Sequence, residues 1–257
     1  MATLQSRIIR PVTAVPRRLR AAEAVLTAAA RRLSFVESEV RGLATVVGSG
    51  DVCMDVGAEY GLYSVPLARL VSASGRVIAV EPTPDLVQWL RFTARGLGAR
   101  TLTVAPVALG ARSGRGELSV PRRWNLPVHG RSYLKDGSIH PGPNIEFPSA
   151  ATIPVRVQTL DGLCDELGVD RLDFLKIDVE GAELAILVGS EMVSRHRPTI
   201  MLEIEDRHLG RYGRRAADVF KLLSEKKYAM YGWLGQRWQS LTGPHPRLRN
   251  YLFTPAN

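Results

Sequence analysis

The sequence predicts an α/β fold in which a mostly parallel sheet carries helices on both faces. Short apolar runs alternate with stretches of helical periodicity from Asp51 onward, and this alternation is typical of strand–helix–strand units in a parallel sheet. The chain has 257 residues, of which 45% are hydrophobic and 23% are charged. This ordinary globular composition excludes disordered and fibrous classes, and the length is compatible with one α/β domain.

The elements follow one another in a regular order. The first strand is predicted at 52–56, and Gly57 begins the turn into a helix near 61–72. A second strand covers 76–80, and Pro84 suits the first turn of the next helix, at 84–98. The other predicted strands span 101–107, 116–120, 153–157, 172–177, 199–204, 227–233 and 251–253, and the other helices span 159–167, 181–195 and 214–226.

Two segments precede this alternating pattern. Residues 1–16 contain two prolines and no periodicity, so we expect a flexible basic arm. Apolar residues recur every three or four positions from Leu19 to Leu43, which predicts an amphipathic helix over 17–45. We expect this helix to dock on the main domain, 46–257, or to pair two chains in a homodimer. Weak contact with a membrane surface is the alternative.

The segment 121–150 differs from its surroundings. It is rich in proline, glycine and polar residues, and a loop of this length inside a domain is usually a binding loop or lid. We expect it to cover a substrate. Its candidate contact residues are Trp124, His129, Tyr133 and His140.

The basic charge of the chain is concentrated near one end. The net charge is +9, and five arginines with no acid lie within residues 1–22. The remaining +4 is spread over the other 235 residues, so no nucleic-acid partner is expected.

The cysteines and the apolar runs bear on the compartment. Cys53 and Cys164 lie among apolar residues and are too few for a disulfide framework. No run approaches the roughly 18 apolar residues of a transmembrane helix. We therefore expect a cytoplasmic protein.

The strongest local signal is a glycine turn flanked by acids. Asp55 ends the first strand, Gly57 and Gly61 form a G-x-x-x-G turn, and Glu81 ends the second strand. The dinucleotide motif has a different spacing, G-x-G-x-x-G, and an acid at this strand end would repel a pyrophosphate. An acid at the end of the second strand is suited to ribose hydroxyls. The combination favours S-adenosylmethionine, and the predicted cofactor-binding residues are Asp55, Gly57, Ala58, Gly61, Glu81 and Pro82.

From Asp51 to Pro255 the chain resembles the FkbM-type family of S-adenosylmethionine-dependent class I methyltransferases. The most specific matching segment is Phe174-Leu-Lys-Ile-Asp-Val-Glu-Gly-Ala-Glu183, which follows Thr159-Leu-Asp161. The other matching segments are Asp55-Val-Gly-Ala-Glu-Tyr-Gly-Leu-Tyr-Ser64, Val77-Ile-Ala-Val-Glu-Pro-Thr-Pro84, Val107-Ala-Leu-Gly110 and Pro198-Thr-Ile-Met-Leu-Glu-Ile-Glu205. The chain departs from the family at Glu59 and Thr83, where asparagine is common.

The resemblance implies a Rossmann-like fold with a seven-stranded sheet whose last strand runs antiparallel between its neighbours. It also implies methylation of an oxygen atom, with acceptors that include hydroxyls of sugars, glycolipids and polyketide-like products.

Three residues are candidates for the catalytic site. Asp178 lies at the carboxyl end of a predicted strand, where parallel sheets bind ligands, and its carboxylate suits removal of a proton from an attacking hydroxyl. Lys176 is predicted to orient that carboxylate, and Glu203 ends the neighbouring strand. The alternative is that Lys176 and Asp178 form a structural ion pair.

No metal site is predicted. Asp178 and Glu203 are suited to a hard divalent ion, but none of the five histidines forms a ligand pair with another, and no third ligand has a clear spacing.

Three alternative functions remain open from the sequence. The first is a module that binds the donor without catalysis, suggested by Glu59 and Thr83. The second is a nicotinamide oxidoreductase, which the absent G-x-G-x-x-G motif disfavours. The third is a nucleic-acid methyltransferase.

Overall fold

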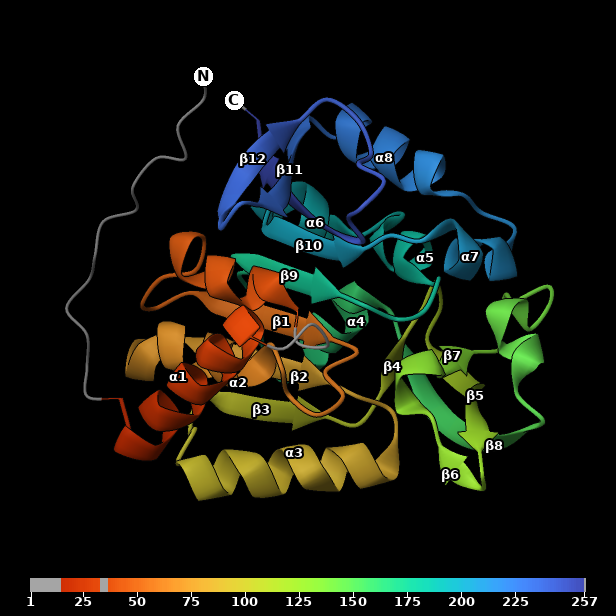
Figure 1. Ribbon diagram of the computed structural model, residues 1–257, viewed down its shortest axis with the longest axis horizontal. Coiled ribbons are helices and arrows are strands. Elements are labelled where there is room, and N and C mark those ends of the chain that lie inside the picture. The colour runs from red at the N-terminus through yellow and green to blue at the C-terminus, as the bar shows by residue number, and fades with distance from the viewer. Residues whose placement is uncertain (1–14, 33–36, 257) are drawn as a thin grey trace.

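The computed structural model describes residues 15–32 and 37–256. The expected basic arm, 1–16, therefore lies almost entirely outside the described residues. Within them, an eight-stranded sheet has the order β12-β11-β13-β10-β9-β1-β2-β3 (Figure 1). Its strands are β1 (Val52–Val56), β2 (Arg76–Val80), β3 (Leu102–Ala105), β9 (Phe174–Ile177), β10 (Thr199–Glu203), β11 (Tyr228–Leu234), β12 (Arg237–Leu241) and β13 (Asn250–Pro255).

The directions of these strands match the expected class. The five strands β3, β2, β1, β9 and β10 run parallel to one another. The last strand, β13, lies between β10 and β11 and is antiparallel to both. The strand count differs from the prediction: β12 pairs with β11 as an eighth strand at the edge. The turn at Gly235 joins β11 and β12 in a hairpin, and the sequence analysis predicted no strand for the second arm.

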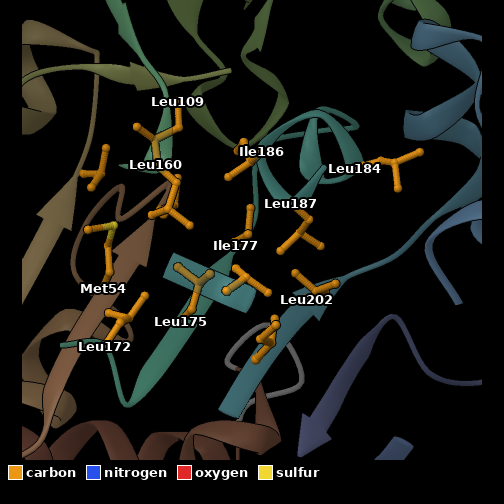
Figure 2. Packing of buried hydrophobic residues seen from close by; sticks show 14 of the residues in the cluster. Met54, Leu109, Leu160, Leu172, Leu175, Ile177, Leu184, Ile186, Leu187 and Leu202 are labelled. Carbon is orange, nitrogen blue, oxygen red and sulfur yellow. The ribbon is translucent and has the colours of Figure 1, made fainter. Parts of the chain in front are cut away.

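Apolar side chains alternate between the two faces of the sheet. In β1, Met54 belongs to a core cluster on one face and Cys53 to a cluster on the other, as the two-residue period of a strand requires. The Met54 face packs against α4 (Leu160–Leu167), α5 (Glu183–Leu187), α6 (Glu191–His196) and α8 (Ala216–Glu225). Figure 2 shows this cluster, with Leu175 and Ile177 of β9 facing Leu187.

The opposite face of the sheet is covered by three other helices. They are α1 (Arg17–Arg32), α2 (Ser64–Leu70) and α3 (Pro84–Leu97), together with the 3-10 helices η1 (Ser38–Thr45) and η2 (Ser72–Ser74). The sequence predicted one helix for 181–195, but α5 and α6 are separate helices divided by the turn at Gly189.

The structure gives Asp161 of the Thr-Leu-Asp motif a role at the start of α6. Its carboxylate accepts hydrogen bonds from the backbone N–H groups of Glu191 and Met192 at 2.9 and 3.0 Å.

The segment before β1 differs from the predicted single helix over 17–45. Helix α1 extends to Arg32, and residues 38–45 form the 3-10 helix η1. The apolar face of α1 packs on α2 and η1 within the same chain, with Leu19 fully buried. The Nε1 atom of Trp238 donates to the carbonyl of Gly42 at 3.2 Å. Docking on the main domain thus uses this face, and homodimer formation stays a prediction.

The predicted loop 121–150 contains regular structure, which corrects the sequence expectation. Strands β5 (Gly114–Arg123) and β8 (Ser149–Gln158) pair antiparallel over nine residue pairs. They form a second sheet with β4 (Ala108–Leu109), β6 (Leu126–Pro127) and β7 (Tyr133–Leu134). Its small core includes Leu118, Val120 and Leu134. Because 121–150 is rich in polar residues, proline and glycine, its short strands β6 and β7 could not be recognised from the sequence.

This inserted sheet lies to one side of the central sheet, next to the ends of its parallel strands (Figure 1). The remaining elements are η3 (His129–Arg131), η4 (Gly142–Glu146), α7 (Asp206–Leu209) and η5 (Gly210–Tyr212). Among the described residues, no helix combines the length and apolar character needed to cross a membrane.

Candidate functional site

A cavity of about 590 Å³ lies at the carboxyl ends of the parallel strands. This volume is in the usual range for small-molecule sites. One wall consists of residues that end β1, β2, β9 and β10, and the other comes from the inserted sheet. Of the predicted site residues, the cavity is lined by Asp55, Gly57, Ala58, Glu81, Pro82, Lys176, Asp178 and Glu203. Gly61 is the one that does not line it.

Asp55 is buried at the end of β1. The Ser64 hydroxyl donates a hydrogen bond of 2.5 Å to its Oδ2 atom, which joins the strand end to the start of α2. Burial raises the pKa of Asp55 to about 6, although the Ser64 hydrogen bond opposes this shift. The side chain is thus held in place at the cavity wall and is mostly ionised near neutral pH.

The glycine turn has a conformation that favours glycine. Gly57 has φ +79° and Gly61 has φ +87°. A Cβ atom on Gly57 would overlap the backbone carbonyl of Asp178, so glycine at this position lets the β1 turn lie directly against the end of β9. Gly61 has a local role in the turn. A Cβ atom at this position would lie 3.2 Å from the Leu90 side chain, and the positive φ also favours glycine.

Glu81 is held by the same turn. Its two carboxylate oxygens accept hydrogen bonds from the backbone N–H groups of Glu59 at 3.1 Å and Thr83 at 2.8 Å. Burial nevertheless raises the pKa of Glu81. Each carboxylate oxygen has a second lone pair, so this fixed acid on the cavity wall suits the two hydroxyls of a ribose.

Glu59 lies between the two walls. It has φ +44°, a conformation in which asparagine is better tolerated than glutamate. Burial, followed by repulsion from Asp178 and Glu81, raises the pKa of Glu59 to about 8. Glutamate at this position thus adds an acid to the cavity wall, and its backbone N–H still donates to Glu81.

Lys176, Asp178 and Glu203 come together as predicted. The Nζ atom of Lys176 lies 3.0 Å from Oδ2 of Asp178 and 4.8 Å from the ring centre of Tyr63. Burial alone would raise the pKa of Asp178, but the Lys176 ammonium group holds that pKa below its usual value. Burial and the Asp178 charge raise the pKa of Glu203 to about 10. Asp178 is therefore ionised beside a neutral Glu203.

The inserted sheet contributes only part of what the sequence suggested. His129 and Tyr133 line the cavity, and so does Arg131, which sequence reasoning missed. Trp124 is 86% exposed at the tip of the β5–β6 hairpin. Neither Trp124 nor His140 lines the cavity, so the structure does not bring them to the substrate side.

Sequence reasoning also missed Glu180 and His208. The buried His208 ring lies against the Glu180 carboxylate through its Nδ1 atom, and Glu203 adjoins them. Glu180 follows β9 and Glu203 ends β10, whereas His208 comes from α7. No spacing in the sequence relates α7 to the strand ends, because the pairing depends on how α7 packs on the turn at Gly181.

The cavity residues fit a nucleoside-type donor. The buried acid Glu81 is available to ribose hydroxyls, and the acid Asp55 lies where a dinucleotide fold presents amides to a pyrophosphate. The five parallel strands are followed by β13, which runs antiparallel between β10 and β11. This sheet, together with the acids at the strand ends, defines a class I methyltransferase.

The comparisons with known proteins name the family. The methyltransferase FkbM domain model matches residues 55–230. The chain therefore belongs to the FkbM methyltransferase family and is an S-adenosylmethionine-dependent methyltransferase. This membership sets aside the nicotinamide oxidoreductase alternative.

Several relatives are similar to the chain. The hexuronic acid methyltransferase AglP of Haloferax volcanii is 26% identical over 198 residues, which cover 77% of this chain and 71% of that protein. The AMB antimetabolite synthetase AmbE of Pseudomonas aeruginosa is 29% identical over 198 residues, 67% of this chain but 9% of that protein. The crystal structure of methyltransferase FkbM from Methylobacillus flagellatus has a TM-score of 0.47 at 18% identity, covering 92% of this chain and 59% of that one.

Proposed function

We propose that the chain transfers a methyl group from S-adenosylmethionine to a hydroxyl group of a sugar. The observation that carries this proposal is the ionised Asp178, which is held by Lys176 in the wall of the cavity that also contains Glu81. An ionised carboxylate in a cavity wall is suited to receive a hydroxyl proton. The name of the relative AglP supports a sugar as the acceptor.

In this proposal Asp55, Gly57, Ala58, Glu81 and Pro82 hold the donor, and Gly61 shapes the turn. When bound, the donor supplies an electrophilic methyl carbon on a sulfonium sulfur; the acceptor oxygen gains the O–C bond and the S–C electron pair stays on sulfur. Asp178 accepts the hydroxyl proton and becomes a neutral acid. Lys176 keeps Asp178 ionised beforehand, and Glu203 packs beside it without adding a second negative charge.

A charged sugar is favoured over a neutral one. The Nη1 atom of Arg131 is buried without a hydrogen-bond partner among the described residues, although Arg131 lines the cavity. A buried N–H group of a guanidinium is costly when it has no hydrogen-bond partner, unless a ligand pairs with it. A carboxylate on the acceptor, as in a uronic acid, supplies such a partner.

The test is methyl transfer from isotope-labelled donor to matched glycosides. We expect labelled O-methyl products from a uronic acid glycoside, less from the neutral hexose glycoside of the same configuration, and none with the Asp178→Asn variant. Absence of transfer to any sugar hydroxyl by a chain that binds S-adenosylhomocysteine would contradict the proposal. Labelling of RNA that survives deletion of residues 1–22 would instead favour a nucleic-acid acceptor.

A further inference from the structure

Three side chains from separate elements meet behind the acceptor end of the cavity. Glu180 follows β9, Glu203 ends β10, and His208 lies in α7. Each offers one ligand atom, and the three atoms lie within 4.8 Å of one another. Ligands held ~2.1 Å from one ion lie at most about 4.2 Å apart, so small side-chain movements are enough to bring all three onto a common centre.

The burial of His208 supports a ligand at this site independently of the two acidic side chains. The residue is 3% exposed, and neither ring nitrogen has a hydrogen-bond partner among the described residues. Its Nδ1 atom contacts the Glu180 carboxylate outside hydrogen-bond geometry, and Oε2 of Glu180 is also buried without a hydrogen bond. Buried polar atoms are rarely left in this state, and a bound ion would satisfy both residues at once.

The surroundings of His208 also suit a metal ligand. Its Nε2 atom faces Oε1 of Glu205 at 4.0 Å, and Glu205 is itself held by the Nη2 atom of Arg207 at 2.8 Å. Metal-binding histidines usually direct their second nitrogen toward a carboxylate or a carbonyl, which fixes the ring orientation. Glu205 occupies that position here.

The site opens toward the acceptor. Glu180 and Glu203 line the cavity together with Asp178, whereas His208 does not. An ion bound by the three side chains would therefore have its protein ligands on one side and open positions on the cavity side, which is the usual arrangement of a reactive metal site.

We propose that Glu180, Glu203 and His208 bind one divalent transition-metal ion, of the Mn²⁺ or Zn²⁺ class, in the cavity wall beside Asp178. Glu203 would release its proton on binding the ion. One imidazole with two carboxylates then favours these ions over Mg²⁺, which prefers oxygen ligands alone. The open positions of the ion would take an acceptor oxygen and lower the pKa of its hydroxyl. This catalytic role rests on the proposed function, whereas metal binding itself does not.

The direct test is titration of the full-length chain with MnCl₂, without donor or acceptor, after dialysis against a chelator. We expect one Mn²⁺ per chain, and a nitrogen coupling in the pulsed electron paramagnetic resonance spectrum of the wild-type complex. A buried ion pair between His208 and Glu180 would produce neither signal. Absence of saturable binding up to millimolar MnCl₂, or a bound ion without nitrogen coupling, would overturn the proposal.

Variants locate the site. His208→Gln and Glu180→Gln should each weaken Mn²⁺ binding by at least about tenfold. The control variant His196→Gln changes a histidine at the end of α6 and should bind Mn²⁺ as the wild type does. Thermal melting with and without MnCl₂ keeps the test valid if one variant is unstable, because Mn²⁺ should raise the Tm of the wild type more than that of either site variant. Equal affinity in all four proteins would overturn the assignment.

Discussion

The two walls of the cavity are built in different ways. The wall at the ends of β1 and β2 is made by backbone turns, in which Glu81 receives two backbone N–H groups and Gly57 lies against Asp178. The wall from the inserted sheet presents side chains such as His129 and Arg131 on short strands and a 3-10 turn. We name these the donor wall and the acceptor wall for their proposed roles. We expect the donor wall to tolerate little change in shape, whereas single side chains of the acceptor wall should change specificity.

The largest expected effect is at Asp178, which lies in the cavity wall just after β9. Asp178→Asn should lower kcat by about 10²–10⁴-fold, because the amide cannot accept the hydroxyl proton. Donor binding should change by less than about threefold, since the substitution keeps the side-chain volume. Turnover with a saturating uronic acid glycoside and calorimetry with S-adenosylhomocysteine separate the two quantities.

The matched control for this variant is Asp170→Asn, which changes an exposed aspartate before β9. It should leave both quantities unchanged. Unchanged turnover in Asp178→Asn would remove the assignment of the base and leave Lys176–Asp178 as a structural ion pair.

A smaller effect is expected at Glu81, on the donor wall alone. Glu81→Ala should weaken binding of S-adenosylhomocysteine by about 10–100-fold, because hydrogen bonds to a charged group contribute about 1.5–3 kcal/mol. The titration is run in chelator, so that donor binding is measured without metal. Glu117→Ala, on the inserted sheet, is the control and should bind normally. Equal binding by both variants would mean that the donor does not contact Glu81.

The clustering of the donor-wall residues at one edge of the sheet agrees with the sequence analysis, whereas their role in donor binding stays a prediction. Asp55, the glycine turn and Glu81 are consecutive or end adjacent parallel strands, so sequence spacing alone brings them to one edge of the sheet. The strand order, with β13 inserted between β10 and β11, follows from the family resemblance. The buried Lys176–Asp178 pair follows from the two-residue period at the end of β9.

The acceptor wall depends on packing that no local pattern encodes. Strands β6 and β7 have two residues each, too short for a periodic signal, so 121–150 had the pattern of a loop. Trp124 was one candidate for substrate contact, but its side chain is exposed and does not line the cavity. His208 reaches Glu180 only because α7 packs on Gly181, where any Cβ atom would meet the carbonyl of His208.

The third prediction changes specificity on the acceptor wall. Arg131→Leu should raise KM for the uronic acid glycoside by about tenfold, since it removes one charge-assisted contact. The KM for the neutral glycoside and the affinity for S-adenosylhomocysteine should stay as in the wild type. The backbone of the variant is still held by the side chain of Asn144, whose Nδ2 donates to the Arg131 carbonyl at 2.6 Å.

Arg123→Leu is the matched control for this variant. Arg123 is exposed and lies over the Trp124 ring, outside the cavity, so its loss should alter neither KM. A parallel rise of KM for both glycosides in Arg131→Leu would show that Arg131 shapes the wall without recognising a carboxylate.

The smallest effect is expected at Glu59, where the two walls meet. Glu59→Asn should stabilise the fold by about 1 kcal/mol at pH 7, because asparagine adopts the positive φ more readily than glutamate. In a chain of this size that gain corresponds to a rise of about 2–4 °C in Tm. Donor affinity should be preserved, since the backbone N–H of Glu59, which binds Glu81, is unchanged.

The gain should also depend on pH. The pKa of Glu59 is raised from 4.5 to about 8 on folding, so the folded state holds its proton more tightly than the unfolded state. The stability linked to this proton is fully present below about pH 4.5 and is lost as the pH rises through 8. The Tm advantage of Glu59→Asn over the wild type should therefore be larger at pH 9 than at pH 6. A Tm advantage that does not change with pH would mean that the relaxed backbone conformation is its only cause. It would also mean that the Glu59 carboxyl group is in contact with solvent.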